Sequence, residues 1–393
     1  MNDPVVIVGL ARTPMGGLQG DFRDCTAAEL GAVAIRAAVE RAGISAADVE
    51  EVIMGCVLPA GQGQAPARQA SLGAGLPLGA GCTTVNKMCG SGMKATMFAH
   101  DLLLAGTNRV MVAGGMESMS NAPYLLPKAR TGYRMGHQQV LDHMFLDGLE
   151  DAYDKGRLMG TFAEDCASKY AFTREAQDAF AVASLERAQR AITAGDFAWE
   201  IAPVTVKSGK SEKIVDRDQQ PLEADFAKIP QLRPAFRKDG TVTAANASSI
   251  SDGAAALVMM TEAQAKKRGA KPLARMVAQA SNAHEPEWFT TAPVGAIQKV
   301  LAKAGWKAGE VDLYEVNEAF AVVTMAAMKD IGIPHDKVNV NGGAVAMGHP
   351  IGATGARIMT TLIYALKKRG LKKGVAALCI GGGEATAVAL EVL

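Results

Sequence analysis

Cys89 is the cysteine whose sequence surroundings best suit a nucleophile. It lies in the segment VNKMCGSGMKA, where an expected strand ends in a glycine-rich turn and a helix through Leu104 begins. A thiol on such a turn faces unpaired backbone N–H groups and the positive end of the helix dipole, which predicts a lowered pKa. The alternative is a small buried cysteine without a chemical role, the usual state of a lone cysteine.

Three further segments carry groups that could act with this thiol. His349 lies in a second glycine-rich loop before an expected helix, and Cys379 ends an apolar run that Gly381 and two more glycines follow. If the loops meet at one face, the imidazole becomes a base beside the thiol. The backbone N–H groups of these glycines would then be free hydrogen-bond donors at the same face. Asn317, after another expected strand, could hold a water or an oxyanion, although asparagine in such a place commonly forms a turn.

The elements that must position these groups occur twice along the chain. Ala42-Gly43 ends an expected helix before a strand over residues 51–57, and Ala304-Gly305 does the same before a strand over residues 311–316. The offset is 262 residues (304 minus 42). Strands over 110–113 and 375–380, both followed by glycines, continue the repeat. Continuous apolar strands suit a sheet covered by helices on both faces, so we expect two similar α/β halves.

A segment of different composition separates the halves. Residues 120–248 contain long polar helices, such as one expected over 174–194, and an apolar run over 253–260 then returns the chain to the core. We therefore expect an N-terminal half built from residues 1–119 and 249–270, an inserted loop domain over 120–248, and a C-terminal half over 271–393. Insertions of this kind on a rigid scaffold commonly carry ligand contacts.

Composition excludes several functional classes. The 393 residues contain 41 Lys and Arg against 40 Asp and Glu, a net charge of +1 that argues against a nucleic-acid partner. The six cysteines have no CxxC or zinc-like spacing, so we expect free thiols, a reducing compartment and no metal site. No apolar run reaches the roughly 18 residues of a membrane helix, and the N-terminus is unlike a signal peptide. These features indicate a cytoplasmic protein without membrane contact.

The segments VNKMCGSGMKA, VNEAF, NVNGGAVAMGHPIGATGAR and CIGGGEA together resemble the four signature segments of the thiolase family. Their order and spacing match that family over essentially the whole chain. The resemblance implies an α/β thiolase fold: two pseudo-symmetric βαβαβαββ halves that form a layered α/β/α/β/α core, with a loop-domain insertion.

The resemblance also implies an acyltransferase mechanism. Cys89 would be the nucleophile that forms an acyl-enzyme, His349 its base, and Cys379 the acid/base for a Claisen condensation. One oxyanion hole would consist of His349 with a water held by Asn317, and another of the backbone N–H groups of Cys89 and Gly381. The expected reaction converts two acetyl-CoA into acetoacetyl-CoA and CoA, reversibly by thiolysis, within fatty-acid metabolism.

Positions that match family contacts to the CoA thioester are Leu149, Met159, Phe236, Ala244, Ser248, Phe289, Ala319 and Phe320. Two departures from the family pattern concern this arm of the substrate. Leu158 replaces a frequent His, and an Arg that stacks on adenine in some members falls near Pro221. The nucleotide is then either bound with modest affinity or held by other basic residues, for which the candidates are Lys207, Lys210, Arg217 and Lys228.

Substrate length and assembly follow from local resemblances. Phe289 stands where many bacterial biosynthetic members have Met, and with TAANAS at 243–248 it resembles acetoacetyl-CoA thiolases of the mitochondrial type. A bulky Phe suits a C4 chain; the alternative is a 3-ketoacyl-CoA thiolase of broader chain length, as in fatty-acid β-oxidation.

Leu185 replaces the Tyr with which some members bind potassium, which argues against potassium activation, and no cofactor is expected. Residues 119–145 match the family's tetramerisation loop and favour a homotetramer, a dimer of dimers, over a monomer with a lid.

Functions from other classes fit less well. A nucleotide-binding oxidoreductase needs G-x-G-x-x-G between a strand and a helix, and Pro77 follows Gly73-x-Gly75 closely. A ketoacyl synthase shares the doubled fold but uses two histidines in its second half, where this chain has Asn317 and Cys379. A non-catalytic CoA- or lipid-binding relative would lack one of the four reactive residues.

Overall fold

Ten strands form the centre of the molecule in the computed structural model, which describes residues 3–209 and 211–393. The first half contributes β1 (Val5–Arg12), β2 (Gly16–Gly17), β3 (Glu51–Gly55), β4 (Gly81–Val85), β5 (Val110–Ser118) and β10 (Ser251–Thr261). The second half contributes β11 (Ala274–Ala283), β12 (Leu313–Val316), β13 (Lys373–Ile380) and β14 (Glu384–Val392). Their order is β12-β13-β14-β11-β1-β10-β5-β3-β4, with β2 beside β10. A short antiparallel pairing of β1 with β11 joins the two halves.

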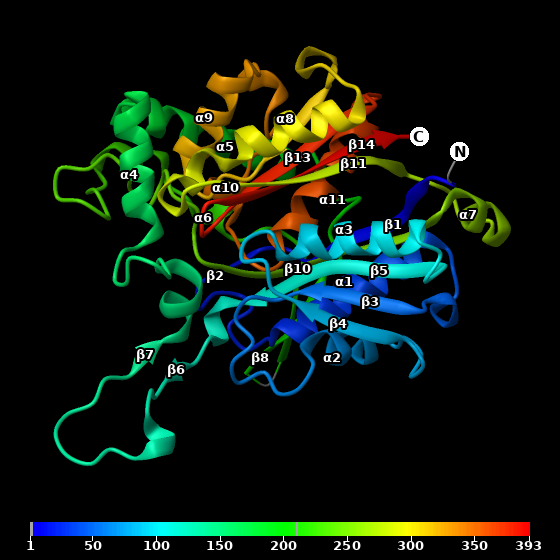
Figure 1. The fold of residues 1–393 in the computed structure, drawn as a ribbon, viewed down its shortest axis with the longest axis horizontal. Coiled ribbons are helices and arrows are strands. Elements are labelled where there is room, and N and C mark those ends of the chain that lie inside the picture. Colours follow the sequence, from blue (N-terminus) through cyan, green and yellow to red (C-terminus); the bar gives the residue numbers. More distant parts are fainter. Residues whose placement is uncertain (1–2, 210) are drawn as a thin grey trace.

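Helices cover both faces of each half-sheet and also lie between the two. Figure 1 shows α3 (Ser91–Leu104) and α11 (Thr354–Arg369) between the strands of the first half and those of the second. The helices α1 (Ala27–Ala42) and α2 (Pro66–Gly73) pack on the outer face of the first half. On the second half, α8 (Ala292–Ala304) and α9 (Ala321–Ile331) cover the outer face. The predicted α/β/α/β/α layering is confirmed.

The repeat is visible in local geometry as well as in topology. α1 ends at Gly43 with φ of 66°, and α8 ends at Gly305 with φ of 69°. A 3-10 turn follows each helix, over Ala46–Asp48 and Ala308–Glu310, at the same offset of 262 residues (308 minus 46). β3 then runs parallel to β5, and β12 runs parallel to β13. The duplicated pattern in the sequence therefore corresponds to a duplicated fold.

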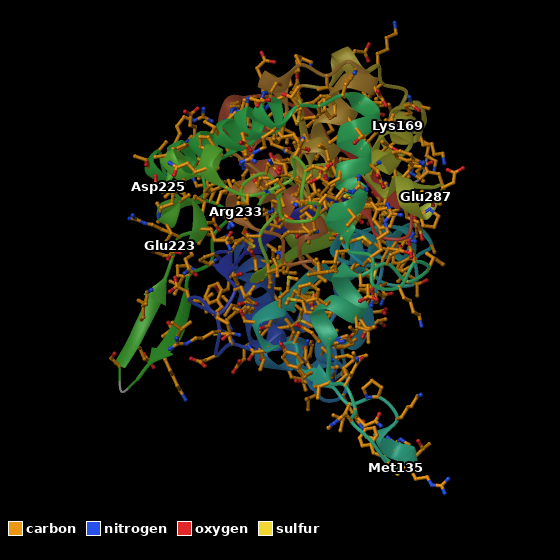
Figure 2. All side chains as sticks on the ribbon, turned by 90° about the vertical axis from the view of Figure 1, so that its left-hand side faces the viewer. Met135, Lys169, Glu223, Asp225, Arg233 and Glu287 are labelled. Atoms are coloured by element: carbon orange, nitrogen blue, oxygen red, sulfur yellow. The ribbon has the colours of Figure 1, made fainter. Side chains whose placement is uncertain are left out.

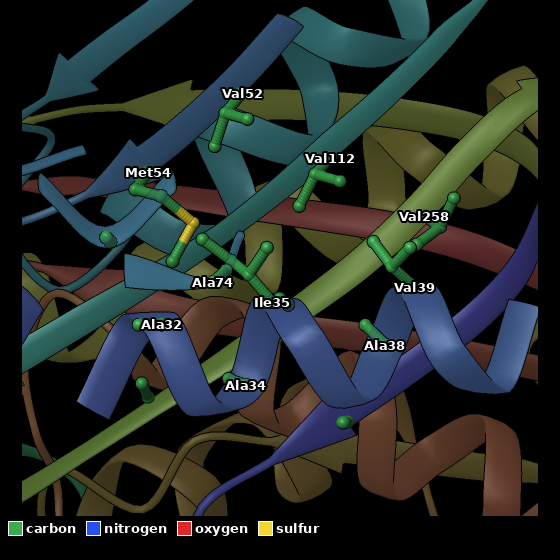
Figure 3. Close-up of a cluster of buried hydrophobic side chains, with 14 of the residues drawn as sticks. Ala32, Ala34, Ile35, Ala38, Val39, Val52, Met54, Ala74, Val112 and Val258 are labelled. Carbon is green, nitrogen blue, oxygen red and sulfur yellow. The ribbon is translucent and has the colours of Figure 1, made fainter. Parts of the chain in front are cut away.

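The outer core of the first half shows why α1 forms where it does. A capping box starts the helix: the backbone N–H of Thr26 donates to Glu29 Oε2 (2.8 Å) and the N–H of Glu29 donates to Thr26 Oγ1 (3.2 Å). Its apolar face, with Ile35 and Val39, packs against Val258 and other buried side chains of the sheet (Figure 3).

The predicted end of one strand was wrong. β5 continues through Gly114 and Gly115 as far as Ser118, because both glycines keep their ladder pairing, with Ala256 and Ala255 of β10. Glycine is needed there because other backbone lies very close. A Cβ on Gly115 would lie 2.0 Å from the carbonyl oxygen of Gly352, in the second half.

We expect Gly115→Ala to lower the free energy of unfolding by about 1–3 kcal/mol, because a rigid backbone oxygen cannot make room for the added methyl. Urea denaturation of the purified protein would measure it. Gly79→Ala is the matched control, since nothing lies within 4 Å of a Cβ there, and its effect should stay within about 0.5 kcal/mol. Equal stability of the two variants would contradict the close approach of the halves.

The segment between the halves wraps around the core and also projects from it. It contains α4 (Met159–Tyr170), α5 (Arg174–Thr193), α6 (Gln220–Glu223), a π-helical turn over Phe145–Leu149, and the hairpins β6 (Tyr124–Leu125) with β7 (Leu141–Asp142) and β8 (Val204–Ser208) with β9 (Ser211–Val215). Arg12, fully buried in β1, holds the segment through Glu200 (2.6 Å) and Asp218 (2.6 Å). Met135, 91% exposed, lies at the tip of the projecting part (Figure 2).

The remaining helices are short. α7 (Glu262–Arg268) follows β10, and α10 (Ala344–Met347) precedes the His349 loop. Among the described residues, every helix is too short or too polar to cross a bilayer.

Candidate active site

A tight turn between β4 and α3 presents Cys89. The Ser91 hydroxyl accepts the N–H of Lys87 (2.8 Å) and donates to the carbonyl of Met88 (2.6 Å). The side chain of Asn86 accepts the N–H of Met88 (2.9 Å). Met88 itself has φ of 47°, a left-handed conformation that a non-glycine residue rarely adopts. The turn is thus strained and held by side chains, which places the thiol ahead of α3 as predicted.

The predicted pKa shift of Cys89 was wrong in its net sign. Burial of the sulfur raises the pKa to about 11, although the N–H groups of Gly381 and of Cys89 itself lower it by hydrogen bonding. The expected donors are therefore present, but loss of hydration outweighs them. At neutral pH Cys89 is a thiol, so a nucleophilic reaction needs a neighbouring base.

His349 can be that base because it is neutral. Its backbone N–H donates to the carbonyl of Ser249 (3.0 Å), and its Nδ1 lies 2.6 Å from the hydroxyl of Thr354. Burial, together with the charge of Arg357, lowers the imidazole pKa to about 3. Nε2 has no hydrogen-bond partner among the described residues. A free lone pair in a buried ring is what proton abstraction requires.

Cys379 lies beside Cys89, although it belongs to the other half. It is fully buried in the apolar cluster that includes Phe289 and Phe320. Gly381, two residues further on, is the residue whose N–H reaches the Cys89 sulfur. Burial raises the pKa of the Cys379 thiol well above its usual value, and the neighbouring Cys89 raises it again. The two thiols therefore influence each other's ionisation.

Three of the predicted groups, Cys89, His349 and Gly381, line one cavity of about 200 Å³. The rest of its wall is almost entirely apolar. Asn317 follows β12 directly and stands two residues before Ala319 of the cavity wall; its amide Oδ1 and Nδ2 are buried and have no partner among the described residues. Such an unsatisfied amide suits the holding of a water or an oxyanion.

The predicted CoA contacts divide between this cavity and a neighbouring hollow. The cavity is lined by Leu149, Met159, Phe236, Ser248, Phe289, Ala319 and Phe320, and also by Leu158. Ala244 lies outside it, in a hollow that it shares with Lys228. Segment 244–249 contributes to both spaces, so they adjoin.

The other basic candidates lie elsewhere. Lys207 lines a groove beside α1, and Arg217 lines a third hollow near Phe197. Lys210 falls outside the described residues. Lys228 is thus the candidate that adjoins a predicted CoA contact.

Glu117 is a buried residue of the site that the sequence analysis missed. Its Oε2 accepts the N–H groups of Val57 (2.9 Å) and Gly352 (2.8 Å), and Oε1 accepts that of Leu58 (3.1 Å). One carboxylate therefore ties the loop after β3 to the His349 loop. Burial raises its pKa to about 7 despite these donors. The signal in the sequence was a single acidic residue in the apolar run VMVAGGMES.

The cavity wall also contains parts that motif reasoning missed. The π-helical turn Phe145–Leu149 places Phe145 and Gly148 beside Leu149 in the wall. π-helical turns are frequent at functional sites, but no sequence pattern indicated this one. The described residues contain no group of three or more His, Cys, Asp or Glu side chains that could hold a metal ion.

Comparisons with known proteins agree with this geometry. Residues 5–263 match the family model described as thiolase, N-terminal domain, and residues 270–392 match thiolase, C-terminal domain. The chain is 54% identical to acetyl-CoA acetyltransferase 2 of Arabidopsis thaliana, covering 99% of this chain and 97% of that one. It is 49% identical to acetyl-CoA acetyltransferase of Schizosaccharomyces pombe, covering 100% and 99%. The crystal structure of the Bacillus anthracis acetyl-CoA acetyltransferase superposes with a TM-score of 0.97 at 41% identity, covering 100% and 99%.

Proposed function

The chain belongs to the thiolase family, and we propose that it is an acetyl-CoA C-acetyltransferase that converts two acetyl-CoA into acetoacetyl-CoA and CoA. The observation that carries this proposal is that Cys89 and the neutral imidazole of His349, from different halves, line one apolar cavity, while the Cys379 thiol interacts with Cys89. A nucleophile, its base and a second acid/base are what a two-step acyl transfer needs.

In the first step Cys89 attacks the thioester carbonyl while His349 takes its proton. The sulfur–carbon bond of the acyl-enzyme forms, the bond to CoA breaks, and Cys379 gives its proton to the departing CoA thiolate. The ring of His349 is unprotonated throughout the neutral range, so its lone pair is available to accept this proton.

In the second step the Cys379 thiolate takes a proton from the α-carbon of another acetyl-CoA. The carbanion attacks the acyl carbon, a carbon–carbon bond forms, and Cys89 leaves and recovers its proton from His349. Acetylated Cys89 cannot ionise, so no Cys89 thiolate opposes formation of the Cys379 thiolate base.

Preorganised donors stabilise the two oxyanions in this scheme. We assign the backbone N–H groups of Cys89 and Gly381 to one, and His349 with a water held by Asn317 to the other. The N–H groups already point at the Cys89 sulfur, and the amide of Asn317 has no hydrogen-bond partner in the part of the chain that the structure describes. Donors fixed before reaction need no reorganisation, and each is typically worth about 10²–10³ in rate.

The CoA arm would leave the cavity over segment 244–249 toward Lys228. The cavity of about 200 Å³ favours a short acyl chain, and the 3-ketoacyl-CoA thiolase of broader chain length is the alternative. Thiolysis rates for acetoacetyl-CoA, 3-ketohexanoyl-CoA and 3-ketodecanoyl-CoA test the choice. A strong preference for the C4 substrate supports our proposal, whereas activity that is flat or rises with chain length supports a role in β-oxidation.

Phe289 should set this limit, because its buried ring lines the cavity between Phe162 and Phe320. We expect Phe289→Leu to raise the ratio of 3-ketohexanoyl-CoA to acetoacetyl-CoA thiolysis by about tenfold, since small volume changes in apolar pockets discriminate on that scale. Phe162→Leu is the control: that ring packs 6.1 Å from Phe289 but is not in the cavity wall. The ratio should stay at its wild-type value there, and an equal rise in both variants would show general loosening instead.

Assembly, location and cofactor needs complete the proposal. Residues 119–145 would form the tetramer contact from the inserted domain, which the 91% exposure of Met135 at the projecting tip supports. A cytoplasmic location is supported by six free cysteines. The enzyme would need no cofactor. Leu185, in the hollow beside Ala244 and Val345, supports a rate that does not depend on potassium.

A further inference from the structure

Among the described residues, Thr354 makes the one side-chain hydrogen bond to the His349 ring. It is the first residue of α11 and is fully buried. Its Oγ1 lies 2.6 Å from Nδ1 of His349 and 2.9 Å from the carbonyl oxygen of Pro350. The hydroxyl therefore has two neighbours but a single hydrogen to donate.

Counting hydrogens decides the direction of both bonds. The Pro350 carbonyl can only accept, so the Thr354 hydrogen serves it, as threonine commonly does toward the carbonyl four residues earlier in a helix. The 2.6 Å contact is then a bond only if Nδ1 carries the imidazole hydrogen and donates it to Oγ1. The other tautomer, with the hydrogen on Nε2, would leave that buried N–H without an acceptor, which costs about 1–3 kcal/mol.

We infer that Thr354 is a positioning residue for the reaction: by accepting the Nδ1 hydrogen it holds His349 in the tautomer whose unprotonated Nε2 faces the cavity and Cys89. This inference rests on the proposed function, in which His349 is the base. The ring is buried, and among the described residues no other side-chain hydrogen bond selects its tautomer.

Among the described residues, Nε2 of His349 has no hydrogen-bond partner that could accept a hydrogen from it. None of the described residues that line the cavity carries a carboxylate. The charged group that acts on the ring is Arg357, one turn further along α11, and it opposes protonation. Of the cavity side chains, the Cys89 thiol and the Ser248 hydroxyl are the polar neighbours. A lone pair at Nε2 can accept the thiol proton, and a hydrogen there cannot.

The test compares three variants of one helix. Thr354→Val removes the hydroxyl at nearly constant shape, and Thr354→Ser keeps it. Thr360→Val is the matched control, because Thr360 is equally buried in α11 and makes the same bond to the carbonyl four residues back (3.0 Å to Ala356). The readouts are the rate of Cys89 alkylation by iodoacetamide and the single-turnover rate of its acetylation by acetyl-CoA.

We expect Thr354→Val to slow both rates by about 10- to 100-fold, part of the roughly 10²–10⁴ that general-base catalysis supplies. Thr354→Ser and Thr360→Val should stay near wild type. In a His349→Ala background, Thr354→Val should add nothing, because its effect passes through the ring. Wild-type rates in Thr354→Val, equal losses in the Val and Ser variants, or a full loss on top of His349→Ala would each overturn the inference.

A second measurement needs no Thr354 variant and so does not depend on its folding. In protein labelled with [15N]histidine, the His349 signals, identified by their absence in His349→Ala, should report a protonated Nδ1 and an unprotonated Nε2. The reverse tautomer would overturn the inference. Alkylation and NMR also separate it from the proposed function: if both behave as expected but no acetoacetyl-CoA forms, the tautomer assignment stands and the proposed reaction fails.

Discussion

Cys89→Ala should abolish acyl transfer. Without the sulfur no acyl-enzyme can form, and loss of a covalent nucleophile typically removes at least about 10⁴ in rate. Incubation with acetyl-CoA followed by peptide mass spectrometry should find acetyl on Cys89 of the wild-type protein and none in the variant. Acetoacetyl-CoA formation should disappear in parallel.

The control is Cys82→Ala, which removes another partly exposed thiol from β4, just before the catalytic turn. It should be acetylated and active like the wild type. If Cys89→Ala still produced acetoacetyl-CoA, or if the wild-type acetyl group were found on another residue, Cys89 would not be the nucleophile and the mechanism proposed here would fail.

Cys379→Ser should separate the two chemical steps. A hydroxyl is a much weaker acid than a thiol, so its conjugate base is not available to take the α-proton of the second acetyl-CoA. Cys89 should still become acetylated, while condensation should fall by about 10²–10⁴, the range for loss of general acid–base catalysis. Acetylation is followed by mass spectrometry, and condensation by acetoacetyl-CoA formation.

The matched control for this variant is Cys166→Ser. Cys166 is fully buried in the same apolar cluster as Cys379, and neither thiol is among the residues that line the cavity, but Cys379 interacts with Cys89. The same substitution there should leave condensation largely intact. A fully active Cys379→Ser enzyme, or equal losses in the two variants, would refute the division of labour between the two thiols.

Local sequence signals predicted the elements around the site well. The capping residues of α1, the helix that follows Cys89 and ends at Leu104, and the long helix at 174–193 are all where their patterns placed them. These features depend on contacts between near neighbours in the chain. The repeated order of helix, glycine and strand further predicted that Cys89 and His349 occupy corresponding places in two halves.

Properties that depend on contacts between distant segments could not be predicted from local sequence patterns. The net pKa of Cys89 was misjudged, because the turn and helix end are local but the burial that raises the pKa to about 11 involves distant segments, such as those that carry Met144 and Ile351. The continuation of β5 through its glycines depends on pairing with β10, more than a hundred residues later. Glu117 binds loops from both halves, so its role could not be inferred from its own segment.

The chain by itself therefore determined which reactive groups are present, on which turns and helix ends they sit, and that two α/β units carry them. Only the folded arrangement decided their ionisation, their mutual approach and the hydrogen-bond partner of His349. The physical reason is that side-chain type and backbone propensity act over a few residues, whereas hydration and Coulomb interaction depend on every atom within several ångströms. Most of those atoms belong to segments far away in the sequence.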